Sequence, residues 1–258
     1  MNHVANSLKS RPMRAPSARP PHWAVACDFD GTVTIGDFTD RLLERYALPS
    51  WRAIEDQWRQ GRIGSRECML RQIDLVRCTP AQLAELIDET QLESGFDTFV
   101  GLIRERRIPL RIVSDGLDAP IIAILRRHGF AGLPIFANRL IHTGPDRYRI
   151  AFPNAREDCT AASGMCKCAL AAAGPRRAAR TLLIGDGASD FCAARSADFV
   201  LAKGALADYC RRQGIGFAPF TDFHDVCRLL TALLDGATPE RLEKPAQPNE
   251  ENMQHEPQ

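Results

Sequence analysis

A short apolar run that ends in two carboxylates constrains the fold of this chain more than any other feature. Trp23 to Cys27 are apolar, and Asp28-Phe29-Asp30-Gly31-Thr32 follows directly. Such a run is typical of a buried strand, and open α/β sheets bind ligands beyond the carboxyl ends of their strands. Side chains two residues apart on a strand share a face, so Asp28 and Asp30 can reach one ligand. The competing interpretation is an ordinary Asp-Gly turn.

The pattern changes to helical periodicity in residues 38–95. Apolar residues recur there at steps of three and four, as amphipathic helices require. Thr79-Pro80-Ala81-Gln82 combines a capping threonine, a proline at the first helical position and a glutamine that can close a capping box. We therefore expect residues 38–95 to form a small helical insertion after the first strand.

Strands and helices alternate after residue 95. We expect strands at 110–113, 181–184 and 199–201, a strand and hairpin within 134–152, and helices at 96–106, 117–128, 165–173, 205–213 and 222–235. This alternation predicts an α/β fold, a Rossmann-like three-layer core with a mostly parallel sheet covered on both faces. Residues 22–37 and 96–236 are expected to form this core.

Composition limits the partners and the location that we expect. The net charge of +1 gives no reason to expect nucleic acid, and no apolar run approaches membrane-spanning length. Nine dispersed cysteines without a secretory signal predict reduced thiols and a cytoplasmic location. The basic, proline-rich residues 1–21 and the polar residues 237–258 are expected to be disordered tails.

Polar residues gather where the expected parallel strands end. They are Asp28 and Asp30 after the first strand, Ser114 after the second, Lys167 at the start of a helix, and Asp186 and Asp190 after strand 181–184. Because the carboxyl ends of parallel strands meet at one edge of a sheet, these groups are expected to converge. Four carboxylates, a hydroxyl and an ammonium suit a divalent cation and a phosphate held between them.

In this order and spacing, the four segments resemble the four sequence motifs of the haloacid dehalogenase superfamily, over roughly residues 22–235. The helical insertion is similar to the cap of the phosphoserine-phosphatase-like branch, which implies a helical cap at 38–95 and a catalytic core at 22–37 and 96–236. Within the branch, Ile135-Phe136-Ala137-Asn138 and the cysteine-bearing segment from Cys159 to Lys167 resemble the 2-hydroxy-3-keto-5-methylthiopentenyl-1-phosphate phosphatases of methionine salvage.

The resemblance implies a phosphatase that acts on a small phosphorylated metabolite with Mg²⁺ as cofactor. It implies that Asp28 is the nucleophile that forms an aspartyl-phosphate, and that Asp30 is the general acid and base. The metal site would consist of Asp28, Asp30 through its backbone carbonyl, Asp186 and Asp190. Asp190 would orient Lys167 or a metal-bound water.

The resemblance also implies a set of substrate-binding residues. They are Ser114, Asp115, Gly116 and Lys167 around the phosphate, with Asp37 on the flap and Arg71 on the cap near the leaving group. Lys203 is an alternative to Lys167, although no neighbouring motif supports it. A homodimer is a candidate assembly, and the sequence leaves the oligomeric state open.

Other functions remain open at this point. Phosphoserine phosphatase is the nearest competitor, but Ser114-Asp115-Gly116 stands where that enzyme usually has two glycines. A haloacid dehalogenase would need neither a metal nor a second acid, and a non-catalytic phosphate-binding protein would tolerate loss of a motif residue. Cys159, Cys166 and Cys168 suggest zinc, but they lack a Cys-x-x-Cys pair and a clear fourth ligand.

Overall fold

A computed structural model describes residues 22–168 and 179–242 of the chain. The described strands are β1 (His22–Cys27), β2 (Leu110–Leu117), β3 (Ile135–His142), β4 (Tyr148–Ala151), β5 (Ala179–Gly185), β6 (Phe199–Ala202) and β7 (Phe217–Pro219). They form one sheet in the order β4-β3-β2-β1-β5-β6-β7, in which only the β3–β4 pair is antiparallel. The predicted α/β core with a mostly parallel sheet is confirmed.

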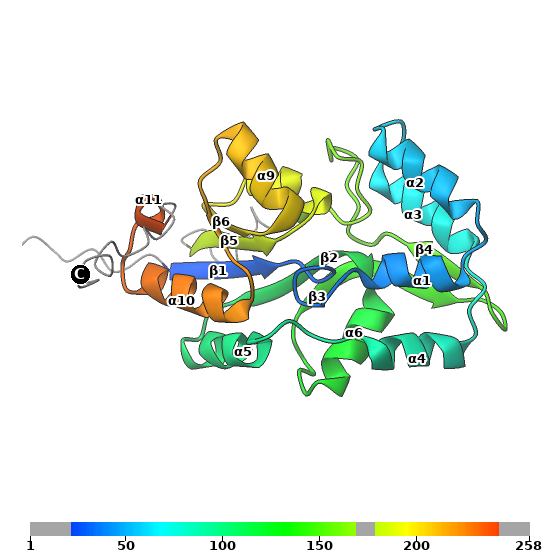
Figure 1. Ribbon diagram of the computed structural model, residues 1–258, viewed down its shortest axis with the longest axis horizontal. Helices are drawn as coiled ribbons and strands as arrows, with labels where there is room; N and C mark the ends of the chain where they lie inside the picture. The colour runs from blue at the N-terminus through cyan, green and yellow to red at the C-terminus, as the bar shows by residue number, and fades with distance from the viewer. Residues whose placement is uncertain (1–21, 169–178, 243–258) are drawn as a thin grey trace, which may run out of the picture.

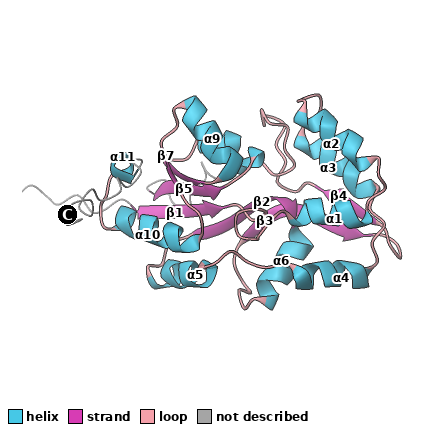
Figure 2. Ribbon diagram, viewed as in Figure 1, coloured by secondary structure: helices cyan, strands magenta, loops and turns pink. Residues whose placement is uncertain are grey.

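Helices cover both faces of this sheet (Figure 1). The described helices are α1 (Phe38–Tyr46), α2 (Trp51–Arg59), α3 (Ser65–Asp74), α4 (Pro80–Glu89), α5 (Phe96–Glu105), α6 (Asp118–Arg127), the 3₁₀ turn η1 (Ala188–Asp190), α8 (Phe191–Ala194), α9 (Gly204–Gln213), α10 (Phe223–Leu234) and α11 (Pro239–Leu242). In Figure 2, α5 and α10 lie on one side of the strands and α9 on the other. No helix in these described segments is long and apolar enough to cross a membrane.

The central strand β1 is buried on both faces because successive side chains alternate between two apolar clusters. Val25 and Cys27 join the cluster that includes α5 and α10, whereas Ala26 joins the cluster that includes α8 and α9. Cys27 lies in register with Ile184 of β5. The carboxyl ends of β1 and β5 are therefore level, which brings the loops that follow them together.

The segment between β1 and α5 is helical, as its periodicity predicted. Thr79 and Gln82 form the expected capping box at the start of α4, where the Thr79 hydroxyl accepts from the Gln82 amide. Figure 1 shows α1, α2 and α3 beyond the tip of β1, at the end of the sheet where the carboxylates gather.

Two expectations about the strands differ from the structure. The strand expected at 110–113 runs on to Leu117, so Ser114, Asp115 and Gly116 lie within β2, where the register against β3 shifts. A bulge of this kind lets a strand continue while it redirects side chains, which local propensity does not reveal. The edge strand β7 was not expected, because it is three residues long and ends in a proline.

The tail predictions fall mostly outside the described residues, as do residues 169–173 of the expected helix 165–173. Within the carboxyl-terminal tail, Pro239–Leu242 form α11, which corrects the expectation of disorder for that turn. The expectation that all thiols are reduced is wrong for one pair, because Cys168 and Cys192 form a disulfide. The fold brings these residues together although 24 positions separate them.

Candidate active site

The loop after β1 is held against the loop after β5. The Asp28 amide donates to the Ile184 carbonyl at 2.9 Å, and the Thr32 hydroxyl donates to Asp186 Oδ1 at 2.6 Å. Gly31 has a φ of +71°, and a Cβ built there would lie 2.5 Å from Asp186 Oδ2. A glycine is needed at this turn because any side chain would displace the Asp186 carboxylate.

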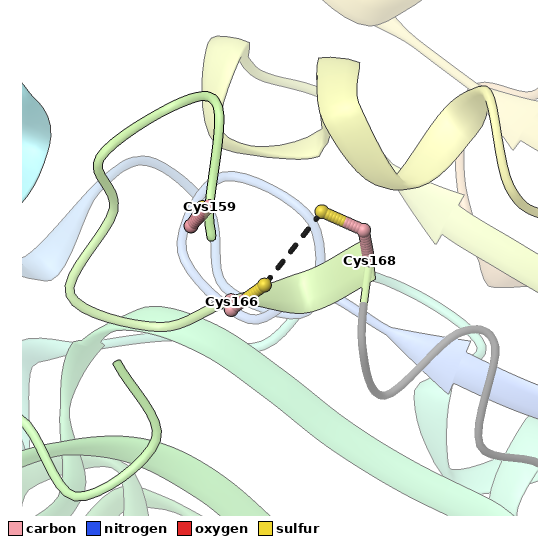
Figure 3. Close-up of side chains that lie close together, drawn as sticks. All are labelled: Cys159, Cys166 and Cys168. Carbon is pink, nitrogen blue, oxygen red and sulfur yellow. Dashed lines mark hydrogen bonds between the residues drawn. The ribbon is translucent and has the colours of Figure 1, made fainter. Parts of the chain in front are cut away.

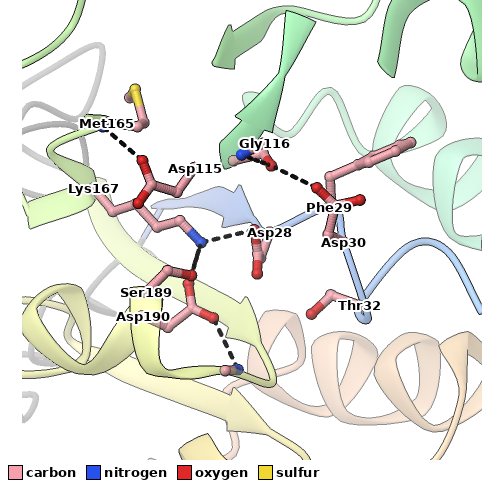
Figure 4. Close-up of polar contacts among 12 residues, drawn as sticks. Asp28, Phe29, Asp30, Thr32, Asp115, Gly116, Met165, Lys167, Ser189 and Asp190 are labelled. Carbon is pink, nitrogen blue, oxygen red and sulfur yellow. Dashed lines mark hydrogen bonds and ion pairs between the residues drawn. The ribbon is translucent and has the colours of Figure 1, made fainter. Parts of the chain in front are cut away.

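Lys167 lies between two buried carboxylates, as Figure 4 shows. Its Nζ is 2.7 Å from Asp28 Oδ1 and 2.8 Å from Asp190 Oδ1, and it donates to the Ser189 hydroxyl at 2.9 Å. The Lys167 side chain is 2% exposed and that of Asp190 is 0% exposed. Burial alone would lower the pKa of Lys167, but Asp190 and Asp28 raise it well above its usual value, so the ammonium stays charged.

Three carboxylates converge beside this lysine. One oxygen each from Asp28, Asp186 and Asp190 lies within 4.8 Å of the others. Burial, followed by the Asp190 charge, raises the pKa of Asp28, and burial is also the largest cause of the raised pKa of Asp186. Three carboxylates against one ammonium leave an excess of negative charge. Hard oxygen donors at this spacing fit a divalent cation such as Mg²⁺.

Asp30 faces the same space from the other side of Asp28. Its Oδ1 accepts from the Phe38 amide at 3.0 Å, and the Ser114 hydroxyl lies 3.5 Å from its Oδ2. A Cβ added at Gly116 would collide with this carboxyl group. Burial is the largest cause that raises the pKa of Asp30 to about 6. The group can therefore exist as acid or as base near neutral pH.

Asp115 links three parts of the chain. Its Oδ2 accepts from the Ser65 hydroxyl on α3 at 2.7 Å, and its Oδ1 accepts from the Asn138 amide at 3.0 Å and the Met165 backbone amide at 2.9 Å. Burial raises its pKa in spite of these bonds. Asp115 therefore fixes α3 and the Lys167 segment relative to β2.

These residues surround a cavity of about 240 Å³. One wall consists of residues at or just after the carboxyl ends of β1, β2 and β5. The other wall consists of residues between positions 37 and 72, in or next to helices α1, α2 and α3. The lining residues are Asp28, Asp30, Ser114, Asp115, Gly116 and Asp186–Ser189 on the first wall, and Asp37, Thr39, Asp40, Leu43, Glu55, Trp58, Arg59, Ser65, Cys68, Met69 and Gln72 on the second. Lys167 and Asp190 are buried behind the lining.

The structure brings most of the predicted site residues together at this cavity. Two basic candidates, one arginine and one lysine, do not line it. Asp37 lines the cavity and caps α1, where its Oδ1 accepts from the Asp40 amide at 2.9 Å. Arg71 is not among the lining residues and instead contacts Gln57 at 3.0 Å and Glu67 at 3.4 Å. Lys203, the alternative to Lys167, pairs with Glu93 at 2.7 Å and does not line the cavity.

Sequence reasoning missed several residues on the helical wall. Ser65 and Arg59 are the clearest cases, since Ser65 donates to Asp115 and Arg59 pairs with Glu55 at 3.0 Å. No motif marks such positions. The available signal was their place in the helical segment, since helical periodicity does not show which polar residues reach a cavity.

Comparison with known proteins agrees with this geometry. The family model for haloacid dehalogenase-like hydrolases matches residues 25–195. A protein of Brevibacillus brevis named 2-hydroxy-3-keto-5-methylthiopentenyl-1-phosphate phosphatase is 33% identical over 210 residues, which cover 79% of this chain and 93% of that protein. A protein of the same name from Geobacillus kaustophilus is 35% identical, over 78% of this chain and 91% of its own length.

Solved structures share the fold at low sequence identity. A phosphoserine phosphatase with an analogue of its phospho-aspartyl intermediate superimposes with a TM-score of 0.61 at 16% identity, over 81% of this chain and 99% of that one. A hydrolase of the same family from Salmonella enterica gives a TM-score of 0.64 at 21% identity, over 86% and 74% of the two chains. The resemblance inferred from the four motifs is confirmed, and this chain belongs to the haloacid dehalogenase-like hydrolase family.

Proposed function

We propose that this chain is a Mg²⁺-dependent phosphatase that hydrolyses a small phosphate monoester through an aspartyl-phosphate on Asp28. The observation that carries the proposal is the 2.7 Å ion pair between Lys167 and Asp28 at the cavity wall. The ammonium favours the ionised, nucleophilic form of Asp28 against the effect of burial. It also places positive charge beside the position that a phosphate would occupy.

The carboxylate cluster supports Mg²⁺ as the cofactor. We assign the ion to Asp28, Asp186 and the backbone carbonyl of Asp30, while Asp190 orients Lys167 through their 2.8 Å contact. When bound, the ion would supply charge neutralisation that lets a phosphate dianion approach these carboxylates. The buried Asp190 also accepts from the Asp186 and Gly187 amides at 3.3 and 3.4 Å, which suits an orienting role.

The two carboxylates of the first loop divide the reaction between them. Asp28 attacks the phosphorus while Asp30 donates its proton to the leaving alcohol, and the bond from phosphorus to that oxygen breaks. Asp30, now a carboxylate, then takes a proton from the water that hydrolyses the aspartyl-phosphate. A pKa of about 6 suits both roles. Ser114 and Gly116 lie on the same wall and are assigned to the phosphate oxygens.

We assign residues 22–37 and 96–236 to a catalytic core and residues 38–95 to a cap. Two observations support this division. The second wall of the cavity comes from residues 37–72, and the Ser65–Asp115 hydrogen bond crosses from one part to the other. Substrate selection is therefore assigned to the cap and phosphate chemistry to the core.

The cap wall favours 2-hydroxy-3-keto-5-methylthiopentenyl-1-phosphate, for which the two relatives are named. Leu43, Trp58 and Met69 give this wall an apolar part that suits a methylthioalkyl chain. Arg59 is the one positively charged side chain among the described cap residues that line the cavity. Its guanidinium already pairs with the Glu55 carboxylate. A substrate carboxylate such as that of phosphoserine would therefore lack an available partner.

A panel of phosphate esters, assayed with and without Mg²⁺, tests the proposal. The enzyme should prefer 2-hydroxy-3-keto-5-methylthiopentenyl-1-phosphate over phosphoserine by about 10-fold or more in kcat/KM. This ratio corresponds to a difference of about 1.4 kcal/mol in transition-state stabilisation. Activity should disappear on chelation and return with Mg²⁺. Preference for phosphoserine would overturn the substrate, and undiminished activity after exhaustive chelation would overturn the metal. Arg71→Ala is the matched control, since Arg71 lies outside the cavity lining.

A small phosphorylated metabolite is the partner that this proposal requires. The cytoplasmic location, the homodimer and the absence of nucleic-acid binding remain predictions from the sequence.

A further inference from the structure

Four of the nine cysteines lie close to the segments that carry Lys167 and Asp190. The Sγ atoms of Cys159, Cys166 and Cys168 all lie within 4.8 Å of one another. Cys192, the second residue of α8, is bonded to Cys168. Figure 3 shows the first three side chains close together, with Cys159 in a loop and Cys166 and Cys168 in the segment that leads to the residues drawn in grey. The other five cysteines belong to no such group among the described residues.

The distance between two of these sulfur atoms is that of neighbouring ligands in a tetrahedral thiolate site. A zinc–sulfur bond of about 2.3 Å places neighbouring ligand sulfurs about 3.8 Å apart. The Sγ atoms of Cys166 and Cys168 are 3.8 Å apart. The Cα atoms of Cys168 and Cys192 are 5.9 Å apart, so both side chains can reach one point once they are no longer bonded to each other. Cys192 is the candidate for the fourth ligand, because its bond to Cys168 places it next to the three clustered thiols.

We propose that the reduced protein binds one Zn²⁺ ion through Cys159, Cys166, Cys168 and Cys192, at a site separate from the carboxylate cluster. Reduction by a dithiol breaks the Cys168–Cys192 bond, gives these sulfurs two electrons and two protons, and converts the dithiol into its own disulfide. Zn²⁺ then displaces the thiol protons to solvent. Four protein ligands close the coordination shell, which is typical of a structural zinc site.

The position of the proposed zinc site points to a structural role for the bound ion. Cys166 and Cys168 flank Lys167, and Cys192 follows Asp190 by two residues. A bound ion would therefore connect the two segments that carry the Lys167–Asp190 ion pair. The disulfide makes the same connection in the oxidised protein.

Metal binding by the full chain tests this proposal directly. The protein is reduced with a phosphine, incubated with ZnCl₂, desalted and analysed for zinc by atomic emission. Separately, Co²⁺ is added and the visible absorption of tetrahedral cobalt thiolate is recorded. We expect about one zinc per chain and the cobalt bands from the reduced protein. The Cys159→Ser/Cys166→Ser variant should bind zinc about 10-fold more weakly or worse, whereas Cys227→Ser should bind as the wild type does.

Two outcomes would overturn the site. One is reduced protein that binds neither metal, which would leave the cluster as a disulfide with neighbouring thiols. The other is zinc that the double variant retains. Because that variant could fail to fold, the unreduced wild type provides a second comparison. With its disulfide intact it should bind about 10-fold less zinc than the reduced wild type, and equal binding by the two would contradict the proposal.

Discussion

Lys167 and Asp28 come from segments 139 positions apart in the chain, and their charged atoms meet at 2.7 Å with both side chains buried. In low-dielectric surroundings each charge stabilises the other, and loss of either partner leaves an uncompensated buried charge. The same contact therefore bears on catalysis and on stability, and variants can separate the two effects.

Asp28→Asn and Asp30→Asn should fail at different steps. Asp28→Asn should abolish covalent catalysis, because an amide does not attack phosphorus. Asp30→Asn should still be phosphorylated by nitrophenyl phosphate, whose leaving group needs no proton, but should hydrolyse the intermediate slowly. General acid–base assistance contributes about 10²–10⁴-fold, so its alkyl phosphate activity should fall by that much. Rapid-mixing kinetics should show a nitrophenol burst from Asp30→Asn and none from Asp28→Asn. A burst from the Asp28 variant would mean that the roles are assigned wrongly.

Lys167→Met should destabilise the metal-free protein strongly. It leaves the Asp190 carboxylate, which is 0% exposed, without its cation, and such a loss typically costs about 3–5 kcal/mol. Urea unfolding in the presence of a chelator measures the free energy of unfolding. Adding Asp190→Asn should recover part of the loss.

Lys203→Met is the matched control for this variant. Lys203 and Glu93 are 18% and 22% exposed, so loss of their ion pair should cost about 1 kcal/mol or less. Equal destabilisation by the two methionine variants would contradict the special position of Lys167. The Lys203 variant should also keep the wild-type KM for substrate.

The stability of the chelated protein should rise as the pH falls from 7 to 5. The pKa of Asp30 is about 6 in the folded state, above its value of about 3.9 in an unfolded chain. Between these values the folded state binds more protons than the unfolded state. The stabilisation that comes from protonated Asp30 is therefore complete below the pKa of this group in the unfolded chain. It is lost as the pH rises through about 6.

Thermal unfolding of the wild type and Asp30→Asn across this pH range checks the prediction. Asp28, Asp37, Asp115 and Asp186 also have raised pKa values, chiefly because of burial, so the variant should reduce the slope without abolishing it. The same change of Tm with pH in both proteins would show that Asp30 does not titrate in this range.

Gly116→Ala should lower kcat while leaving the fold intact. The added methyl group would collide with the Asp30 carboxyl and lie 3.0 Å from the Ser114 hydroxyl. Displacement of the acid and base should cost up to about 10²-fold in kcat on an alkyl phosphate. Gly101→Ala on α5 is the control, because a Cβ there meets no atom within 4 Å. Full activity of the Gly116 variant would argue against Asp30 in its assigned role.

Much of the fold was predictable from local sequence patterns. The apolar run before Asp28 predicted β1, the strand–helix alternation predicted the parallel core, and the Thr79–Gln82 cap predicted the start of α4. These signals are local because hydrophobic periodicity and capping depend on neighbours within a few residues. The four motifs also predicted which polar side chains meet, because strand ends in a parallel sheet share one edge.

Only the tertiary structure decided the features that depend on contacts between distant segments. The bulge that keeps Ser114 to Gly116 within β2 depends on pairing with β3. The choice of Lys167 over Lys203, the position of Arg71 outside the cavity, and the bond from Cys168 to Cys192 all depend on how separate elements pack. Sequence alone determined which chemical groups this protein possesses and that Asp28 and Asp186 follow the ends of β1 and β5. Packing determined which partners those groups meet, because distance, burial and charge compensation belong to the folded chain as a whole.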